Sequence, residues 1–107
     1  MAKTKTDGFS EEEIKLAEIA KVLGHPARIR ILQIVTESDM CITGDIVELL
    51  PLSQSTVSQH LSELKRVNLI QGEINGPKTC YCINPDEIKK AKEVFGKLFS
   101  AIVTKCC

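Results

Sequence analysis

Apolar residues recur every three or four positions through several stretches of the chain, and this spacing is typical of amphipathic α-helices. The first predicted helix begins at Ser10, because Ser10 and Glu13 have the spacing of a capping box, and it ends at Gly24. A second predicted helix begins at His25-Pro26, since proline suits the first position of a helix, and it ends near residues 36–39. The apolar face of the first helix comprises Ile14, Leu16, Ala17, Ala20 and Leu23.

Two further helices are predicted on either side of a very short turn. The third is short and ends at Pro51, because the residue before a proline disfavours the helical conformation. The fourth covers residues 53–66, and the spacing of Val57, Leu61 and Leu64 predicts its buried face. The opposite face begins at the predicted N-cap Ser53 and carries Ser55, Thr56, Ser58, Gln59, Ser62 and Lys65.

A β-hairpin is predicted directly after the fourth helix. Residues 68–74 and 78–84 have the pattern of strands, and Asn75-Gly76 between them is a strong hairpin turn signal. Pro77 follows the turn at once, so we expect an irregular tip rather than a tight two-residue loop.

The last predicted helix, residues 85–105, carries apolar residues in a heptad-like seam. A terminal helix with so much apolar surface needs a partner, and a two-fold dimer through the first and last helices is the simplest source of one. The residues expected at that interface are Ile14, Ala17, Phe95, Leu98 and Ile102.

The predicted order of two helices, a short turn, a third helix and a hairpin is that of a winged helix-turn-helix. The helix after the turn would enter the major groove of DNA, where serine and threonine hydroxyls contact phosphates or bases and glutamine can bind adenine. A polar helix face of this kind is also typical of an ordinary solvated surface, but the short turn and the hairpin favour DNA. The expected contacts are Ser53, Ser55, Thr56, Ser58, Gln59, His60, Ser62 and Lys65.

Length and composition limit the number of domains and the class of protein. A chain of 107 residues suits one domain, so we expect a loose arm at 1–8 and a single winged-helix domain over 9–107. Hydrophobic residues make up 43% and charged residues 26%, the balance of a globular protein. No apolar run approaches the length of about 20 residues that spans a membrane, and no signal-peptide pattern is present. We therefore expect a cytoplasmic protein with no membrane partner.

The formal net charge is zero, which is the one compositional feature against DNA binding. It leaves open a winged helix that binds another protein instead of DNA. An enzyme is not expected, because the sequence holds no P-loop, no dinucleotide-binding glycine motif and little acid–base machinery beyond two histidines.

Three stretches carry a family resemblance: LGHPARIRIL, CITGDIVELLPLSQSTVSQHLSELKRVNLI and GPKTCYCINPDEI. Together they resemble the ArsR/SmtB family of arsenic- and metal-responsive repressors over roughly residues 14–104. The resemblance implies a dimeric repressor that occupies a promoter and leaves it when an inducer binds. It also implies that residues 53–66 are the recognition helix and that residues 75–80, with Lys78, are the tip of the wing.

The family's sensor sites match this sequence only in part. Cys41 stands at the first position of a familiar cysteine pair, but Thr43 occupies the second. A second familiar site uses histidines of the last helix, and residues 85–105 contain none, so a zinc site of that type is not expected.

Thiols remain as the candidate sensor. Five cysteines in a chain without a signal peptide argue against a disulfide framework. Adjacent Cys106 and Cys107 could bind one soft ion such as trivalent arsenic, with Cys41 as a third ligand. Cys80 and Cys82 are the alternative pair, unless they only pack the hairpin. A thiol redox or persulfide sensor that links Cys41 to a C-terminal cysteine is the other interpretation.

Overall fold

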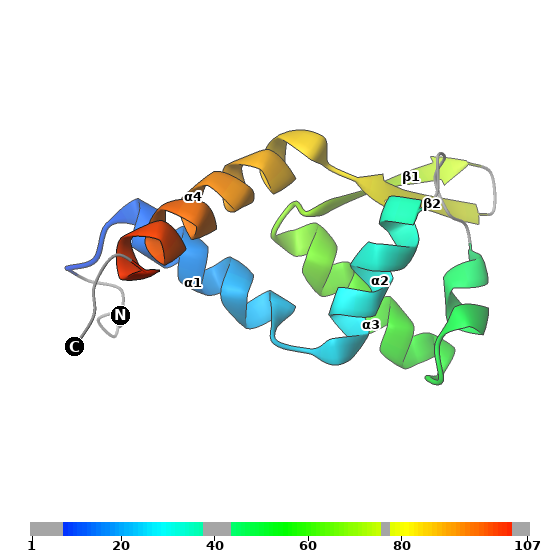
Figure 1. The fold of residues 1–107 in the computed structure, drawn as a ribbon. Coiled ribbons are helices and arrows are strands. Elements are labelled where there is room, and N and C mark those ends of the chain that lie inside the picture. Colours follow the sequence, from blue (N-terminus) through cyan, green and yellow to red (C-terminus); the bar gives the residue numbers. More distant parts are fainter. Residues whose placement is uncertain (1–7, 38–43, 76–77, 104–107) are drawn as a thin grey trace, which may run out of the picture.

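The computed structural model describes residues 8–37, 44–75 and 78–103 (Figure 1). This part of the chain is mostly helical and carries one small antiparallel hairpin, as the sequence predicts. The third predicted helix is a 3-10 helix. In chain order the elements are α1 (Glu11–Leu23), α2 (Pro26–Glu37), η1 (Gly44–Leu49), α3 (Gln54–Arg66), β1 (Ile70–Asn75), β2 (Lys78–Ile83) and α4 (Pro85–Val103).

The predicted capping box at the start of α1 is present. The backbone N–H of Ser10 donates to Glu13 Oε1 over 2.8 Å, and the N–H of Glu13 donates to Ser10 Oγ over 3.1 Å. Each residue thus satisfies a backbone donor that the first turn of the helix leaves without a partner. Gly24 closes α1 through its N–H, which donates to the carbonyl of Lys21.

The end of α3 sets the direction of the hairpin. Asn68 has a φ of 65°, the left-handed conformation that commonly ends a helix. Its N–H donates to the carbonyl of Lys65, and the N–H of Leu69 donates to the carbonyl of Leu64. The carbonyl of Leu69 then accepts from the N–H of Asn84, which ties the start of β1 to the start of α4.

Each strand of the hairpin is one residue shorter than the sequence predicts. The strands pair in antiparallel register from Ile70 with Ile83 to Asn75 with Lys78. The expected irregular tip at residues 76–77 lies outside the described residues. β1 begins two residues later than predicted and ends one residue later, at Asn75, and β2 ends one residue earlier, at Ile83.

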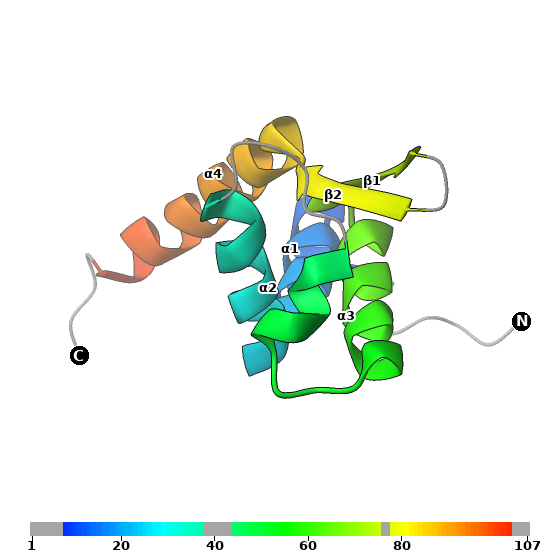
Figure 2. The ribbon, with the colours of Figure 1, turned by 90° about the vertical axis from the view of Figure 1, so that its right-hand side faces the viewer.

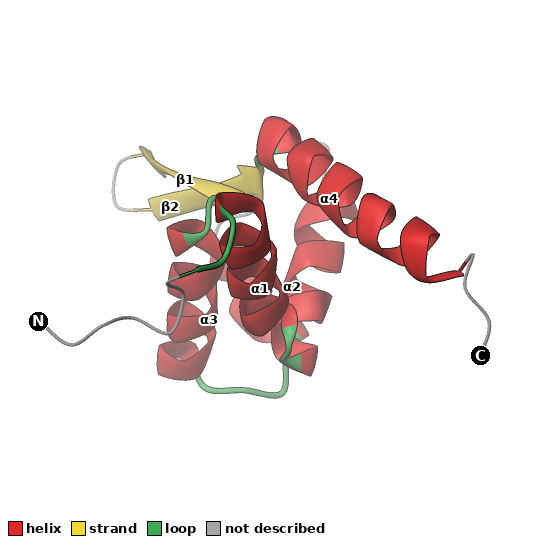
Figure 3. Ribbon diagram, turned by 90° about the vertical axis from the view of Figure 1, so that its left-hand side faces the viewer, coloured by secondary structure: helices red, strands yellow, loops and turns green. Residues whose placement is uncertain are grey.

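The hydrophobic core lies where α1, α2, η1, α3 and the hairpin meet (Figure 2). Its fully buried side chains are Ile31, Ile46, Leu64, Leu69, Ile70, Val22, Val57 and Val67. Helix α4 is different, because none of its residues is buried and its C-terminal end extends beyond the other helices (Figure 3). Within the described ranges, no helix is both long and apolar enough to cross a membrane.

Candidate nucleic-acid interface

Helix α3 presents two chemically distinct faces. Val57, Leu61 and Leu64 point into the core, as their spacing predicts. The outward face is polar, and α3 lies at the edge of the helical bundle below the hairpin (Figure 2). Of the residues expected to contact DNA, the exposed ones are Ser53, Ser55, Ser58, Gln59, Ser62 and Lys65, and Thr56 is partly exposed.

The start of α3 carries a cluster of hydroxyl groups. Ser53 is the N-cap, because its Oγ accepts from the backbone N–H of Thr56 over 3.3 Å. The same Oγ lies 3.0 Å from Thr56 Oγ1 and 3.3 Å from Ser55 Oγ. A helix N-terminus with free N–H groups and hydroxyls favours anions such as phosphate.

The end of α3 lies against the hairpin. A Cβ built on Gly72 of β1 would stand 3.2 Å from Lys65 Nζ and 3.4 Å from Tyr81 Cε1. The lysine side chain therefore passes close over the strand, at a place where a larger residue would crowd it. Lys65, a cation of the predicted DNA face, therefore lies at the junction of α3 and the wing.

Lys78 belongs to the wing by its backbone. It is the first residue of β2 and pairs with Asn75 at the tip of the hairpin. Its side chain lies outside the described part of the structure, so its expected DNA contact stays a prediction.

Arg66 forms an ion pair on the surface instead of extending the polar face. Its Nε and Nη2 each donate to Glu63 over 3.2 Å, and Nη1 lies 3.6 Å from Glu18 of α1. The hydrogen bond from Arg66 holds the pKa of Glu63 below its usual value. These groups are exposed, so the pairs contribute little to stability.

His60 does not lie on the outward face, and the expectation that it contacts DNA is wrong. Its side chain is only 6% exposed, and Nδ1 accepts a hydrogen bond from Arg28 Nε over 3.0 Å. The physical reason is its position in the helix, because residues 57, 60, 61 and 64 share one face at 3.6 residues per turn. The same periodicity that predicts the apolar face could have placed His60 there, but the partner Arg28 could not be read from spacing.

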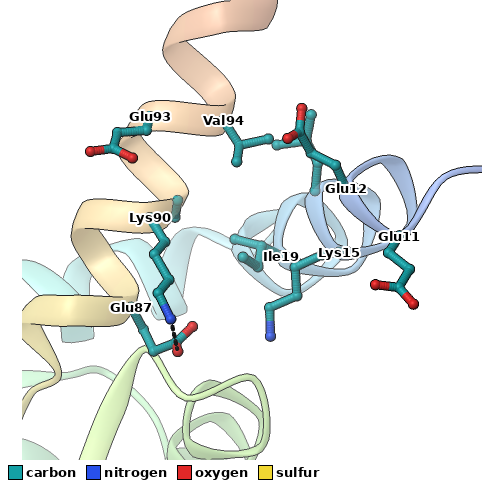
Figure 4. Close-up of a pocket in the computed structure, with 10 residues that line it drawn as sticks. Glu11, Glu12, Lys15, Ile19, Glu87, Lys90, Glu93 and Val94 are labelled. Atoms are coloured by element: carbon teal, nitrogen blue, oxygen red, sulfur yellow. Dashed lines mark ion pairs between the residues drawn. The ribbon is translucent and has the colours of Figure 1, made fainter.

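The surfaces of α1 and α4 enclose a groove of about 350 Å³ (Figure 4). Leu16, Ile19 and Val94 contribute apolar walls, and acidic and basic side chains including Glu12 and Lys90 surround them. A second hollow of about 250 Å³ lies between the same two helices and reaches Leu98. Lys97 of α4 and Glu12 of α1 approach to 3.6 Å beside it.

The residues expected at a dimer interface lie along these two helices. Phe95 packs partly against the core, and its ring stacks on that of Phe99 at a centroid distance of 6.4 Å. Ile14 is partly exposed and Ala17 is exposed. The large apolar side chains that α4 leaves in solvent are Leu98 (42% exposed), Phe99 (58%), Ile102 (54%) and Val103 (81%).

Two of the five cysteines lie in the described part of the chain, and three lie outside it. Cys41, Cys106 and Cys107, expected to bind a soft ion, lie outside the described residues. Cys80 and Cys82 are partly buried on one face of β2, opposite Glu73 and Gln71 of β1. Residues 8–37, 44–75 and 78–103 contain no group of three or more histidine, cysteine or acidic side chains arranged to hold a metal ion.

Comparison with known proteins agrees with this geometry. Residues 25–71 match the model of the family described as bacterial regulatory protein, arsR family. An HTH-type transcriptional regulator of Methanocaldococcus jannaschii is 31% identical over 88 residues, which cover 82% of this chain and 99% of the relative. The arsenical resistance operon repressor of Staphylococcus xylosus is 34% identical over 70 residues, covering 65% of this chain and 66% of that protein.

A solved structure extends the likeness to three dimensions. The crystal structure of the Mycobacterium tuberculosis protein Rv0081 superposes with a TM-score of 0.61 at 35% identity, covering 88% of this chain and 99% of the other. The winged helix-turn-helix fold predicted from the sequence is thereby confirmed. These relatives are regulators, a class of proteins without catalytic activity, which also confirms the expectation that the chain is not an enzyme.

Proposed function

We propose, from the premise that this chain belongs to the arsR family of bacterial regulatory proteins, that it is a dimeric repressor that binds operator DNA through α3. The observation that carries the proposal is the outward face of α3, where exposed hydroxyl and amide side chains stand free of the core. A helix fits the major groove, which is about 12 Å wide. The hairpin beside the end of α3 would then reach the neighbouring backbone.

Each part of the face has a chemical role in this proposal. Gln59 is exposed at mid-helix and suits a bidentate contact with adenine. Ser53 and Ser55, at the helix N-terminus, suit a phosphate, because backbone N–H groups and the helix dipole favour negative charge there. Lys65 would contact phosphate beside the wing, with Lys78 at its tip. Further contacts are proposed for Thr56, Ser58 and Ser62.

Dimerisation is part of the same proposal. Helix α4 has no buried residue, although Leu98 and Ile102 are large and apolar. A second copy of the chain that packs α1 and α4 against their symmetry mates would cover this surface and the grooves between the helices. A domain of this size buries a limited share of its surface alone, so the extra burial stabilises it.

The inducer is proposed to be a thiophilic species, first of all trivalent arsenic. Support comes from the similarity to a relative named as an arsenical resistance operon repressor, and from the affinity of thiolates for soft ions. Cys106 and Cys107 with Cys41 are the proposed ligands, and Cys80 with Cys82 is the alternative pair. A redox or persulfide switch that links Cys41 to a C-terminal cysteine is the competing mechanism.

DNA binding is tested by fluorescence anisotropy with a duplex of the protein's own promoter under reducing conditions. We expect tight binding that weakens steeply as salt increases, because phosphate contacts release counterions. Gln59→Ala should weaken binding by roughly 5- to 150-fold, the worth of one good base contact. Gln33→Ala, at an exposed glutamine of α2, is the matched control and should bind like the native protein. Absence of salt-dependent binding would favour a winged helix that binds another protein.

The inducer is tested by adding arsenite, an organic trivalent arsenical, zinc or cadmium to the preformed complex. We expect arsenicals to release the DNA and zinc to leave it bound. The paired variants Cys106→Ser/Cys107→Ser and Cys80→Ser/Cys82→Ser then distinguish the two thiol sites. Release by oxidant or persulfide, and by none of the metals, would refute the metalloid proposal and favour the redox switch.

A further inference from the structure

One buried polar contact attaches α3 to the rest of the fold. His60 of α3 is 94% removed from solvent, and its Nδ1 accepts from Arg28 Nε over 3.0 Å. Arg28, on the first turn of α2, also donates from Nη1 to the carbonyl of Val22 over 3.1 Å. One guanidinium group therefore connects the end of α1, the start of α2 and the middle of α3.

The hydrogen bond defines the protonation state of His60. Arg28 can only donate, so Nδ1 must carry a lone pair and the ring is neutral, with its proton on Nε2. Nε2 is buried and has no hydrogen-bond partner among the described residues. The His25 ring lies 4.3 Å from the His60 ring at a tilt of 58° and covers it from the turn between α1 and α2.

A second proton on His60 would be unfavourable at this place. It would occupy Nδ1 and point an N–H at the N–H of Arg28, so the hydrogen bond would be lost. The new cation would also face the guanidinium group of Arg28. Burial, then His25, then Arg28 lower the pKa of His60 below its ordinary value.

The remaining charged groups around α3 do not offset this repulsion. Glu63, one turn further along α3, is held by two hydrogen bonds from Arg66. Glu48, the charged residue of η1 whose surroundings are described, is exposed. Lys65 lies at the other end of α3, against Gly72 of β1.

We infer that Arg28 and His60 form a tether that orients the recognition helix, and that a second proton on His60 opens the tether and weakens operator binding. Arg28 and His60 are positioning residues in this scheme, since neither is exposed on the face that would meet DNA. The inference rests on the proposed function, because the consequence is read out as affinity for DNA. Lowering the pH would therefore weaken DNA binding by changing the orientation of α3, and not by changing the side chains that contact the DNA.

The sign of the effect distinguishes the tether from ordinary electrostatics. Lowering the pH makes any protein more positive, which strengthens its attraction to phosphates. An open tether acts in the opposite direction. His60→Asn separates the two effects, because asparagine Oδ1 can accept from Arg28 near the place of Nδ1 but does not titrate.

The experiment is the anisotropy titration repeated between pH 7.5 and 5.5 at constant ionic strength, with reductant and without inducer. We expect native protein to lose up to about tenfold in affinity relative to His60→Asn by pH 5.5, because a histidine released from the tether takes up its proton near its ordinary pKa of about 6.5. His25→Asn, which keeps His60, should retain the loss. Arg28→Lys should weaken binding already at pH 7.5, whereas Arg30→Lys, at an exposed arginine of the same helix, should not.

A second readout does not depend on DNA. Imidazole nitrogen NMR at neutral pH should show His60 as the tautomer with its proton on Nε2, and circular dichroism should show that each variant is folded. Parallel pH profiles of native protein and His60→Asn, or the opposite tautomer, would overturn the tether. Failure of native protein to bind DNA at pH 7.5 would instead overturn the proposed function, while the NMR result would still test the hydrogen bond.

Discussion

Replacing Ile102 by alanine tests the proposed dimer with a magnitude that follows from the structure. The substitution removes three carbon groups, each worth about 0.8 kcal/mol on burial, or about 2.4 kcal/mol in all. Ile102 is 54% exposed in the single chain, so a partner could bury about 1.3 kcal/mol of that amount per copy. A two-fold interface contains the residue twice, which gives about 2.6 kcal/mol, or roughly a 70-fold increase in the dimer dissociation constant.

Sedimentation equilibrium over a range of protein concentrations measures this constant directly. Lys92→Ala is the matched control, because Lys92 is an exposed residue on the same helix and is not part of the apolar seam. We expect the control to dimerise like the native protein. A dissociation constant for Ile102→Ala within twofold of the native value would show that the C-terminal half of α4 is not an interface between copies.

Three further predictions concern the stability of the fold, each measured by urea unfolding. Ser53→Ala removes the N-cap of α3 and should cost about 1 kcal/mol; no loss would mean that the cap hydrogen bond is not important. Leu64→Ala empties a position that is 0% exposed and should cost about 2–5 kcal/mol; a loss below 1 kcal/mol would contradict the packing around α3. The lowered pKa of His60 means that the unfolded chain binds the proton more tightly. Stability from this group is therefore complete above about pH 6.5 and declines as the pH falls below that value, and His60→Asn should remove this part of the decline.

Local signals in the sequence were sufficient for most of the fold. The capping box at Ser10 and Glu13 depends on residues three apart, so its geometry could be inferred without the rest of the protein. The N-cap Ser53 and the hairpin around Asn75 are of the same kind. The buried face of α3 followed from helical periodicity, because only one side of an edge helix can contact the core.

Contacts between distant residues could not be predicted in this way. Arg28 and His60 are 32 positions apart, and only the packing of α2 against α3 brings them within hydrogen-bond distance. The polar character of His60 suggested an outward position, although its spacing from Val57 and Leu64 indicated the inward face. Residue type and periodicity disagreed here, and periodicity was correct: His60 is buried, and its Nδ1 accepts from the partly buried Arg28.

The hydrogen bond between Arg28 and His60 restrains the rotation of α3 about its own axis more sharply than the apolar contacts do. Burial of Val57, Leu61 and Leu64 selects the side of α3 that meets the core, but the hydrophobic effect is non-directional and therefore less sensitive to a small rotation about the helix axis. The hydrogen bond to Arg28 is directional and weakens steeply when its angle changes. Side-chain tips lie about 5–6 Å from a helix axis, so a rotation of about 10° moves them by about 1 Å. A displacement of this size is enough to misalign the paired hydrogen bonds that read a base, which explains why a polar pair at the inward face can decide what the outward face binds.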